Sequence, residues 1–239
     1  PMKKTLCILL FCALLLTGCG DTALETDGTI LLEEKIKYVA LTFDDGPRRG
    51  STDVLLNGLK ERGAAATFFL VGEEIEGNEE LVARMGAEGH QIGNHTWSHQ
   101  RLETASTETI TNEIARTDQA IGSILGGSGY WLRLPYGLLP EEARDQIRVP
   151  VIKWSVDPRD WESREKWAVV NAVMEAVQPG SIILLHDIYP ASVEAALEIV
   201  DRLQAQGYWF VTVEELLRIQ GTDVQPGVMS RSAASWRSL

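Results

Sequence analysis

Basic residues are scarce in this chain of 239 residues, where 22 lysines and arginines stand against 34 aspartates and glutamates and leave a formal net charge of -12. Nucleic-acid binding needs a basic face, and an electrostatic hold on anionic lipid needs one too, so the composition argues against both functions. Cysteine is equally scarce, because the chain holds only Cys7, Cys12 and Cys19. No cysteine follows Cys19, which excludes a disulfide framework for the rest of the chain.

The apolar stretch near the start, Leu6 to Leu16, is too short to cross a bilayer. Lys3 and Lys4 precede it, and small residues end it at Cys19. This arrangement resembles a bacterial lipoprotein signal, which implies that residues 1–18 are a signal peptide cleaved before Cys19 and that Cys19 carries a lipid. The alternative is an ordinary secretory signal with an incidental cysteine. Under the first interpretation the protein is extracytoplasmic and held at the cell membrane by its acyl chain rather than by charge.

The remaining chain is predicted to form a tether, one domain and a tail. Residues 19–35 are polar and without periodicity, as expected of a tether. Residues 36–220 alternate short apolar runs with longer helical patterns, which predicts a single α/β domain built from strand-helix units. The last predicted helix begins with a capping box formed by Thr212 and Glu215. Residues 221–239 are rich in Gly, Ser and Pro, so we expect a polar C-terminal tail that frays.

Seven strands are predicted, which favours a closed or nearly closed barrel over an open sheet. Their expected bounds are Tyr38–Phe43, Ala65–Val71, Gln91–Asn94, Tyr130–Leu134, Val151–Val156, Ser181–His186 and Tyr208–Val211.

Asp44 and Asp45 are adjacent carboxylates at the end of the first predicted strand, and Gly46-Pro47 follows them. Two carboxylates this close cannot both stay ionised cheaply unless a cation or a proton separates their roles, and a metal ion is the simplest remedy. An ordinary solvated turn after a strand is the alternative, because Asp, Gly and Pro are all common turn residues.

His95 and His99 are two of only four histidines in the chain, and they follow the third predicted strand. At this spacing one helical turn would place both imidazoles on the same side. Two histidines and one carboxylate fill three positions of a metal ion and leave one for water. The alternative is a pair of surface histidines on a turn. We interpret His90, which opens the same strand, as structural.

Three further segments end later strands, and with the first two they make five motifs in order. These three are Arg133-Leu134-Pro135-Tyr136-Gly137, Asp157-Pro158-Arg159-Asp160-Trp161 and Leu184-Leu185-His186-Asp187. The five segments together resemble the motifs of the polysaccharide deacetylases, carbohydrate esterase family 4, over about Ile36 to Gln220. The resemblance implies a distorted (β/α) barrel of seven or eight strand-helix units and metal-dependent removal of acetyl groups from N-acetylated sugars.

The resemblance also implies a role for each carboxylate and histidine at the predicted metal centre. Asp44 would be the general base, and Asp45, His95 and His99 would be the metal ligands. Arg133 would hold Asp44 by an ion pair.

The remaining roles concern the acid and the walls of the site. Asp160 would orient His186, the general acid, and the backbone amide of Tyr136 would help to bind the oxyanion. Trp161 and Leu184 would wall a small pocket for the acetyl methyl group. Leu134 departs from the family, which more often carries a second proline there.

The leading hypothesis is therefore an anchored hydrolase that removes N-acetyl groups from N-acetylglucosamine units of a cell-wall glycan, namely peptidoglycan. Chitin oligomers, poly-N-acetylglucosamine and acetyl-xylan remain alternative substrates. An idle member of the fold that binds glycan, or a metal-storage lipoprotein, are alternatives from other classes. The ligand set suits Zn, although Co, Ni or Fe could occupy it. We expect a monomer whose partners are the polysaccharide and, through Cys19, the membrane.

Overall fold

The computed structural model describes residues 36–138 and 141–231, and the predicted signal peptide, Cys19 and the tether lie outside these residues. The strands are β1 (Lys37–Asp44), β2 (Thr67–Leu70), β3 (Gln91–Asn94), β4 (Val151–Ile152), β5 (Ile182–His186), β6 (Tyr208–Phe210) and β7 (Met229–Ser230). The α-helices are α1 (Thr52–Glu61), α2 (Gly72–Ile75), α3 (Glu79–Ala87), α4 (Thr107–Leu125), α5 (Asp160–Ser163), α6 (Lys166–Ala176), α7 (Pro190–Ala205) and α8 (Val213–Ile219). Two 3-10 helices, η1 (Pro135–Gly137) and η2 (Glu141–Gln146), complete the set.

The main sheet is parallel and has β1 at its centre. Its order is β3-β2-β1-β5, and β6 pairs with the N-terminal half of β1. Strand β1 reads Lys-Tyr-Val-Ala-Leu-Thr-Phe-Asp, and its last six residues are buried. A nearly continuous apolar run of this kind is what a parallel strand covered on both faces requires. The predicted α/β class with a parallel sheet is therefore confirmed.

The described residues do not form a continuous closed barrel. Beyond β3 the path continues through isolated bridges, from Asn94 to Leu132, from Leu132 to Val151 and from Val156 to Ile183 of β5. The predicted strand at Tyr130–Leu134 is thus reduced to one bridging residue. The predicted strand at Val151–Val156 breaks after Ile152. There the guanidinium of Arg133 donates to the carbonyls of Ile152 and Lys153, which are then not available to a neighbouring strand.

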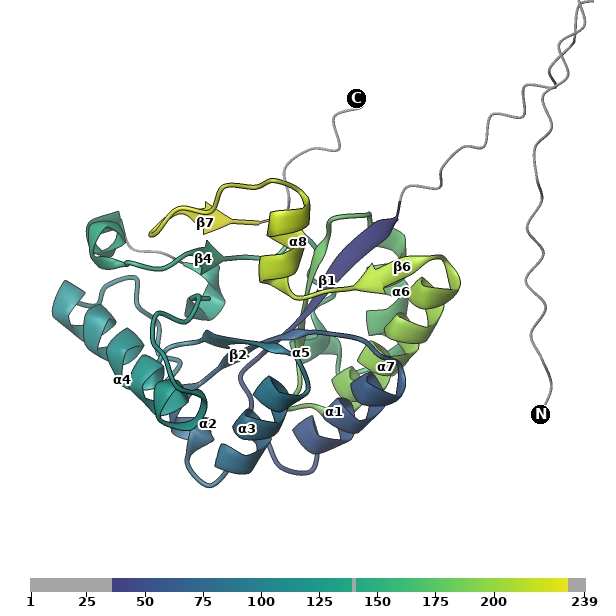
Figure 1. Cartoon of the computed structure of the whole chain (residues 1–239), viewed down its shortest axis with the longest axis horizontal. Helices are drawn as coiled ribbons and strands as arrows, with labels where there is room; N and C mark the ends of the chain where they lie inside the picture. Colours follow the sequence, from purple (N-terminus) through teal and green to yellow (C-terminus); the bar gives the residue numbers. More distant parts are fainter. Residues whose placement is uncertain (1–35, 139–140, 232–239) are drawn as a thin grey trace, which may run out of the picture. The chain divides into compact units, whose positions relative to one another are not determined.

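Helices α4, α3, α1 and α7 lie side by side along one side of β1 and β2, and α8 lies on the other side (Figure 1). The largest core cluster joins the apolar faces of α1, α3, α4 and α7 to the sheet, with Phe43, Phe68, Leu56 and Ile199 among its buried members. Helix α8 packs in a second cluster through Val213, Leu216 and Leu217. Helix α8 begins with the predicted capping box, in which Thr212 and Glu215 each accept from the other's backbone amide. None of the helices in the described ranges has both the length and the apolar character of a membrane span.

The expectation that the chain frays after Gln220 is wrong for part of this segment. Met229 and Ser230 form β7, which pairs in parallel with Val151 and Ile152 of β4. The backbone amide of Lys153 extends this pairing by donating to the carbonyl of Ser230 at 2.7 Å. Residues 232–239 lie outside the described ranges.

Candidate active site

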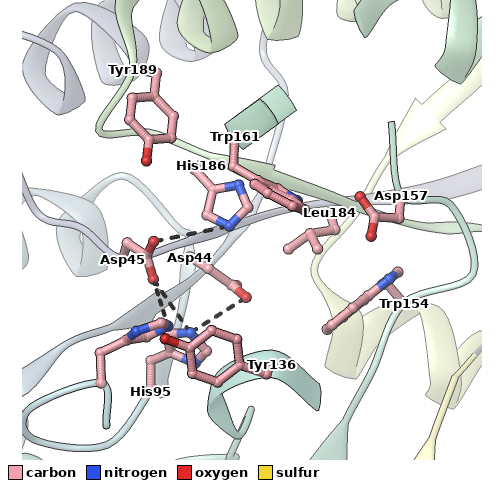
Figure 2. Close-up of a pocket in the computed structure, with 11 residues that line it drawn as sticks. Asp44, Asp45, His95, Tyr136, Trp154, Asp157, Trp161, Leu184, His186 and Tyr189 are labelled. Carbon is pink, nitrogen blue, oxygen red and sulfur yellow. Dashed lines mark ion pairs between the residues drawn. The ribbon is translucent and has the colours of Figure 1, made fainter. Parts of the chain in front are cut away.

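The predicted site residues meet at one edge of the sheet because parallel strands bring their carboxyl ends together. Asp44 is the last residue of β1 and His186 is the last residue of β5, and the two are paired in register. His95 follows β3 directly, two strands away from β1. Figure 2 shows Asp44, Asp45, His95 and His186 converging on one space, with Tyr136 beside them.

Arg133 is fully buried and holds Asp44 in place. One guanidinium nitrogen donates to Asp44 Oδ1 and to Thr42 Oγ1, at 2.7 Å each. The guanidinium also stacks on the ring of Phe69 at 4.1 Å. Burial lowers the pKa of Arg133, and the charge of Asp44 only partly offsets that effect. An arginine in such a place stays charged, so Asp44 faces a permanent cation on the side away from the pocket.

Asp45, His95 and His99 form a cluster whose ligand atoms lie within 4.8 Å of one another. Asp45 Oδ1 is 3.5 Å from His95 Nε2 and 3.3 Å from His99 Nε2. This oxygen is buried and has no hydrogen-bond partner among the described residues. A buried carboxylate oxygen facing two imidazole nitrogens fits a divalent cation, which would satisfy all three groups at once.

The ring orientation of His95 supports the same assignment. Its Nδ1 lies 2.6 Å from the backbone carbonyl of Arg133. A carbonyl can only accept, so Nδ1 carries the proton and Nε2 presents its lone pair toward Asp45. Metal-binding histidines are commonly fixed by a hydrogen bond of this kind on the far nitrogen.

A loop, and not the predicted helical turn, brings His95 and His99 together. The segment after Asn94 is irregular, and Thr96 and His99 adopt positive φ angles of 68° and 52°. Asp45 and Tyr136 do the same, with φ of 72° and 59°. Backbone conformations of this kind are costly for residues other than glycine, and they concentrate at functional sites. The four residues all contribute to the same edge of the sheet.

The charges of the cluster depend on one another. Burial would raise the pKa of Asp45, but close contact with His95 and the charges of the three histidines lower it to about 2. Burial would lower the pKa of His95, but Asp44 and Asp45 raise it overall. Burial and the neighbouring His95 lower the pKa of His99. The cluster therefore places the ionised carboxylate of Asp45 beside the imidazole rings of His95 and His99.

Asp160 holds His186 from behind. Its Oδ1 lies 2.8 Å from His186 Nδ1, and its Oδ2 accepts the backbone amide of His186 at 2.8 Å. Burial would lower the pKa of His186, but the hydrogen bond and charge of Asp160, together with Asp44 and Asp45, raise it to about 9. His186 Nε2 faces the pocket, 4.0 Å from Asp45 Oδ2. The arrangement is suited to donating a proton near neutral pH.

These residues line a pocket of about 380 Å³, a size that fits one sugar unit. The predicted wall residues Tyr136, Trp161 and Leu184 all line it. Three further lining residues, Trp154, Asp157 and Tyr189, were not predicted. Each is within three residues of a predicted site residue or strand end, so proximity in the sequence was the available signal.

The family model described as polysaccharide deacetylase matches residues 32–149. The chain is 41% identical over 184 residues to the peptidoglycan-N-acetylmuramic acid deacetylase PdaC of Bacillus subtilis, covering 77% of this chain and 39% of the relative. It is 36% identical over 188 residues to a peptidoglycan-N-acetylglucosamine deacetylase of Bacillus cereus, covering 75% of this chain and 68% of the relative.

The chain belongs to the polysaccharide deacetylase family. A solved structure agrees, a family 4 acetyl xylan esterase from Clostridium thermocellum in complex with a cobalt ion. It superposes with a TM-score of 0.78 at 32% identity and covers 83% of this chain and all of that one. The chain spans about two fifths of the length of the first of these relatives, PdaC.

Within the polysaccharide deacetylase match lie Asp44, Asp45, His95, His99 and Arg133, which are the candidate base, the ligand cluster and the arginine behind it. Asp160 and His186 lie beyond the matched residues. The hydrogen bonds between them, and the register of His186 beside Asp44, nevertheless tie them to the same site.

Proposed function

We propose that residues 36–220 are the catalytic domain of a metal-dependent hydrolase that removes N-acetyl groups from N-acetylglucosamine units of a cell-wall glycan, namely peptidoglycan. The observation that carries the proposal is the convergence of a metal-type cluster with two separately supported acid-base residues. Asp44 is hydrogen-bonded to Arg133 and His186 is hydrogen-bonded to Asp160. Both residues face the Asp45–His95–His99 cluster.

An amide is a poor electrophile, so its hydrolysis needs help at the carbonyl, at the attacking water and at the leaving nitrogen. A divalent metal held by Asp45, His95 and His99 would supply Lewis acidity to the acetyl carbonyl and ease the deprotonation of water. Asp44 accepts that proton as general base. Its carboxylate is held in position by an ion pair with the buried guanidinium of Arg133.

His186 donates a proton to the departing amine, because Asp160 raises its pKa and fixes its ring. The backbone amide of Tyr136 donates to the oxyanion, a contribution that is typically about 3 kcal/mol for a single donor. Trp161 and Leu184 form the walls that enclose the acetyl methyl group, since both line the pocket beside His186.

Zinc is the proposed metal, because two imidazoles and one carboxylate with one open position are a common catalytic zinc site. Cobalt, nickel or iron could occupy the same set. The related acetyl xylan esterase carries cobalt in its solved structure.

The substrate assignment rests on the relatives, because PdaC and the Bacillus cereus protein are both named as peptidoglycan deacetylases. Chitin oligomers are the second candidate, since a chitooligosaccharide deacetylase of Rhizobium leguminosarum is 41% identical over 155 residues. Poly-N-acetylglucosamine and acetyl-xylan are further alternatives. An idle glycan-binding role is disfavoured because every acid-base and ligand residue of the motifs is present.

Mass spectrometry tests the function directly. The full-length chain is incubated with peptidoglycan fragments, chitin oligomers, poly-N-acetylglucosamine and acetyl-xylan, each with added zinc. Loss of acetyl groups from the wall fragments ahead of the other glycans supports the proposal. Loss of acetyl groups from another glycan alone would assign that glycan as the substrate. Loss from none of the glycans would refute the proposal that the protein is a hydrolase.

The location proposal is that Cys19 carries a lipid, that residues 19–35 tether the domain and that the monomeric enzyme works outside the cytoplasm beside the wall. The sequence from Leu16 to Cys19 supports it, as does the wall substrate named for the relatives. Labelling with a radioactive fatty acid tests it, and label that persists in Cys19→Ala would contradict it.

A further inference from the structure

The rim of the pocket carries an uneven distribution of charge. Four of its aromatic residues each have a cation over the ring, namely Arg101 on Tyr136, Lys153 on Trp154, Arg159 on Trp161 and Arg164 on Tyr189. Glu103 pairs with Arg101, and Glu162 pairs with Arg159, so those two cations are neutralised. At the Trp154 end, Lys153 shares the rim with the exposed carboxylate of Asp157.

The Tyr189 end is different, because two arginines there have no acidic partner. The guanidinium of Arg164 lies 4.6 Å from the ring centre of Tyr189. Arg48 donates to the carbonyl of Ile188, the preceding residue, at 3.4 Å. Neither arginine has a carboxylate within 4.0 Å among the described residues, and both side chains are exposed.

The backbone holds Arg164 at this place despite a cost. Arg164 follows α5 with φ 49° and ψ 32°, a left-handed position where glycine is the usual residue. Its Nε donates to the carbonyl of Trp161 at 3.3 Å, which fixes the guanidinium and leaves its outer nitrogens free to bind a ligand. The backbone of Arg48 is fixed by its amide, which donates to Thr52 Oγ1 at 2.8 Å, and its guanidinium is positioned by the bond to the Ile188 carbonyl.

Tyr189 joins this arginine pair to the reaction centre. Its ring centre lies 6.2 Å from that of His186, and in Figure 2 it lies on the far side of His186 from Trp154 and Asp157. A sugar whose acetamido nitrogen faces His186 would therefore extend a neighbouring substituent toward Tyr189. Guanidinium groups bind carboxylates through paired hydrogen bonds, which ammonium groups cannot reproduce.

We propose that Arg48 and Arg164 form a subsite for a carboxylate carried by the glycan next to the acetyl group that is removed. The inference rests on the proposed deacetylase function and specifies its substrate as an anionic glycan. In peptidoglycan the carboxylate has two possible sources, the lactyl ether of the muramic sugar and the peptide attached to it. The other end of the pocket, where Asp157 offsets Lys153, would attract the same group less, so the subsite also orients the glycan.

The test uses three glycans of matched length with the full-length chain. Glycan strands freed of peptide expose the lactyl carboxylate, intact fragments carry only peptide carboxylates, and chitin oligomers carry neither. We expect Arg164→Gln and Arg48→Gln to lower the ratio of kcat/KM on an anionic glycan to kcat/KM on chitin oligomers by about tenfold. The glycan on which the loss occurs identifies the source of the carboxylate.

Two control variants separate the subsite from general effects. Arg218 on α8 is exposed, has no ion pair with any described residue and lines no part of the pocket, so Arg218→Gln should leave the ratio unchanged. Arg164→Lys should recover only part of the preference, because it restores the charge without the paired donors. Added salt should reduce the preference of the original chain more than that of the glutamine variants.

Dissociation constants for the same glycans, read from tryptophan fluorescence, give an answer that does not depend on turnover. If the original chain deacetylates nothing but binds anionic glycans about tenfold more tightly than chitin oligomers, the proposed function fails and the subsite stands. Equal binding of anionic and neutral glycans, or equal losses on both in the glutamine variants, would overturn the subsite.

Discussion

Asp44 and Asp45 are neighbours in sequence with opposite surroundings. Asp44 is almost fully buried and is bound by Arg133, whereas Asp45 turns toward two histidines with an oxygen that has no hydrogen-bond donor among the described residues. Asp44→Asn should therefore keep the metal and lower kcat about 10²- to 10⁴-fold, because an amide cannot accept the proton of water. Asp45→Asn should first weaken metal affinity. Metal content and kcat measured together in both variants check this; an Asp44→Asn protein that loses metal yet regains activity with excess metal would contradict it.

His186 sets the basic limb of the pH profile. Its pKa is raised to about 9, so kcat/KM should fall as the pH rises through that value and His186 loses its proton. Asp160→Asn removes the negative charge that raises this pKa and one of the two oxygens that accept from His186, so the basic limb should move to lower pH. A pH profile of kcat/KM for both proteins is the measurement. An unmoved basic limb in the Asp160→Asn variant would mean that another group titrates there.

Asp187 is a buried carboxyl group that has no role in the proposed mechanism. It is fully buried, takes a hydrogen bond from Thr52 and leaves Oδ1 without a partner among the described residues. Burial raises its pKa to about 7, so the folded state binds its proton more tightly than the unfolded state does. In the metal-free protein this group should lower the free energy of unfolding as the pH rises from about 4 to about 7, by roughly 2 to 4 kcal/mol.

Asp187→Asn keeps the acceptor for Thr52 and removes the ionisation. Urea unfolding at pH 5 and pH 8, with chelator present, should show the variant gaining stability relative to the original chain only at the higher pH. A gain of equal size at both values would assign the effect to packing instead.

At the scale of elements, the sequence predicted where the strands of the main sheet lie but not the extent of the two-residue strands. Strand β3 has its predicted bounds, and β5 differs by one residue at its start. The weaker pairings depend on distant partners, since β4 is held by β7, from residues some 80 positions later, and ends where Arg133 captures its carbonyls. Two paired residues leave no periodicity to read, so such strands are invisible until the tertiary structure is known.

The capping box of α8 is an element whose energetic contribution can be measured. Thr212 Oγ1 accepts from the Glu215 amide at 3.2 Å, and Val213, Leu216 and Leu217 bury the helix against the sheet. Thr212→Ala should lower the free energy of unfolding by about 1 kcal/mol without changing kcat, because α8 lies away from the pocket. Chemical denaturation measures it. In the double variant with Glu215→Ala the loss should be less than additive, and full additivity would show that the two caps act independently.

At the scale of the whole molecule, the five motifs are predictable as a set because parallel strands deliver their carboxyl ends to one edge. Asp44, Asp45, His95 and His186 follow from that rule and from the chemistry of their side chains. Trp154 and Tyr189 do not, since an aromatic residue beside a strand is as common in a core as in a pocket. Their place on the rim depends on how the loops cross, and proximity to a predicted site residue or strand end was the available local signal.

Metal binding at this edge of the sheet should stabilise the whole folded domain. Its ligands come from the turn after β1 and the loop after β3, which the unfolded chain does not hold together. A metal that binds only the folded state stabilises it by about 2.7 kcal/mol at a free concentration one hundred times its dissociation constant. Chelation should therefore lower the melting temperature, and added zinc should restore it. His99→Ala should melt at one temperature with or without zinc, because the ligand set is broken. If zinc stabilises that variant as much as the original chain, the metal binds elsewhere.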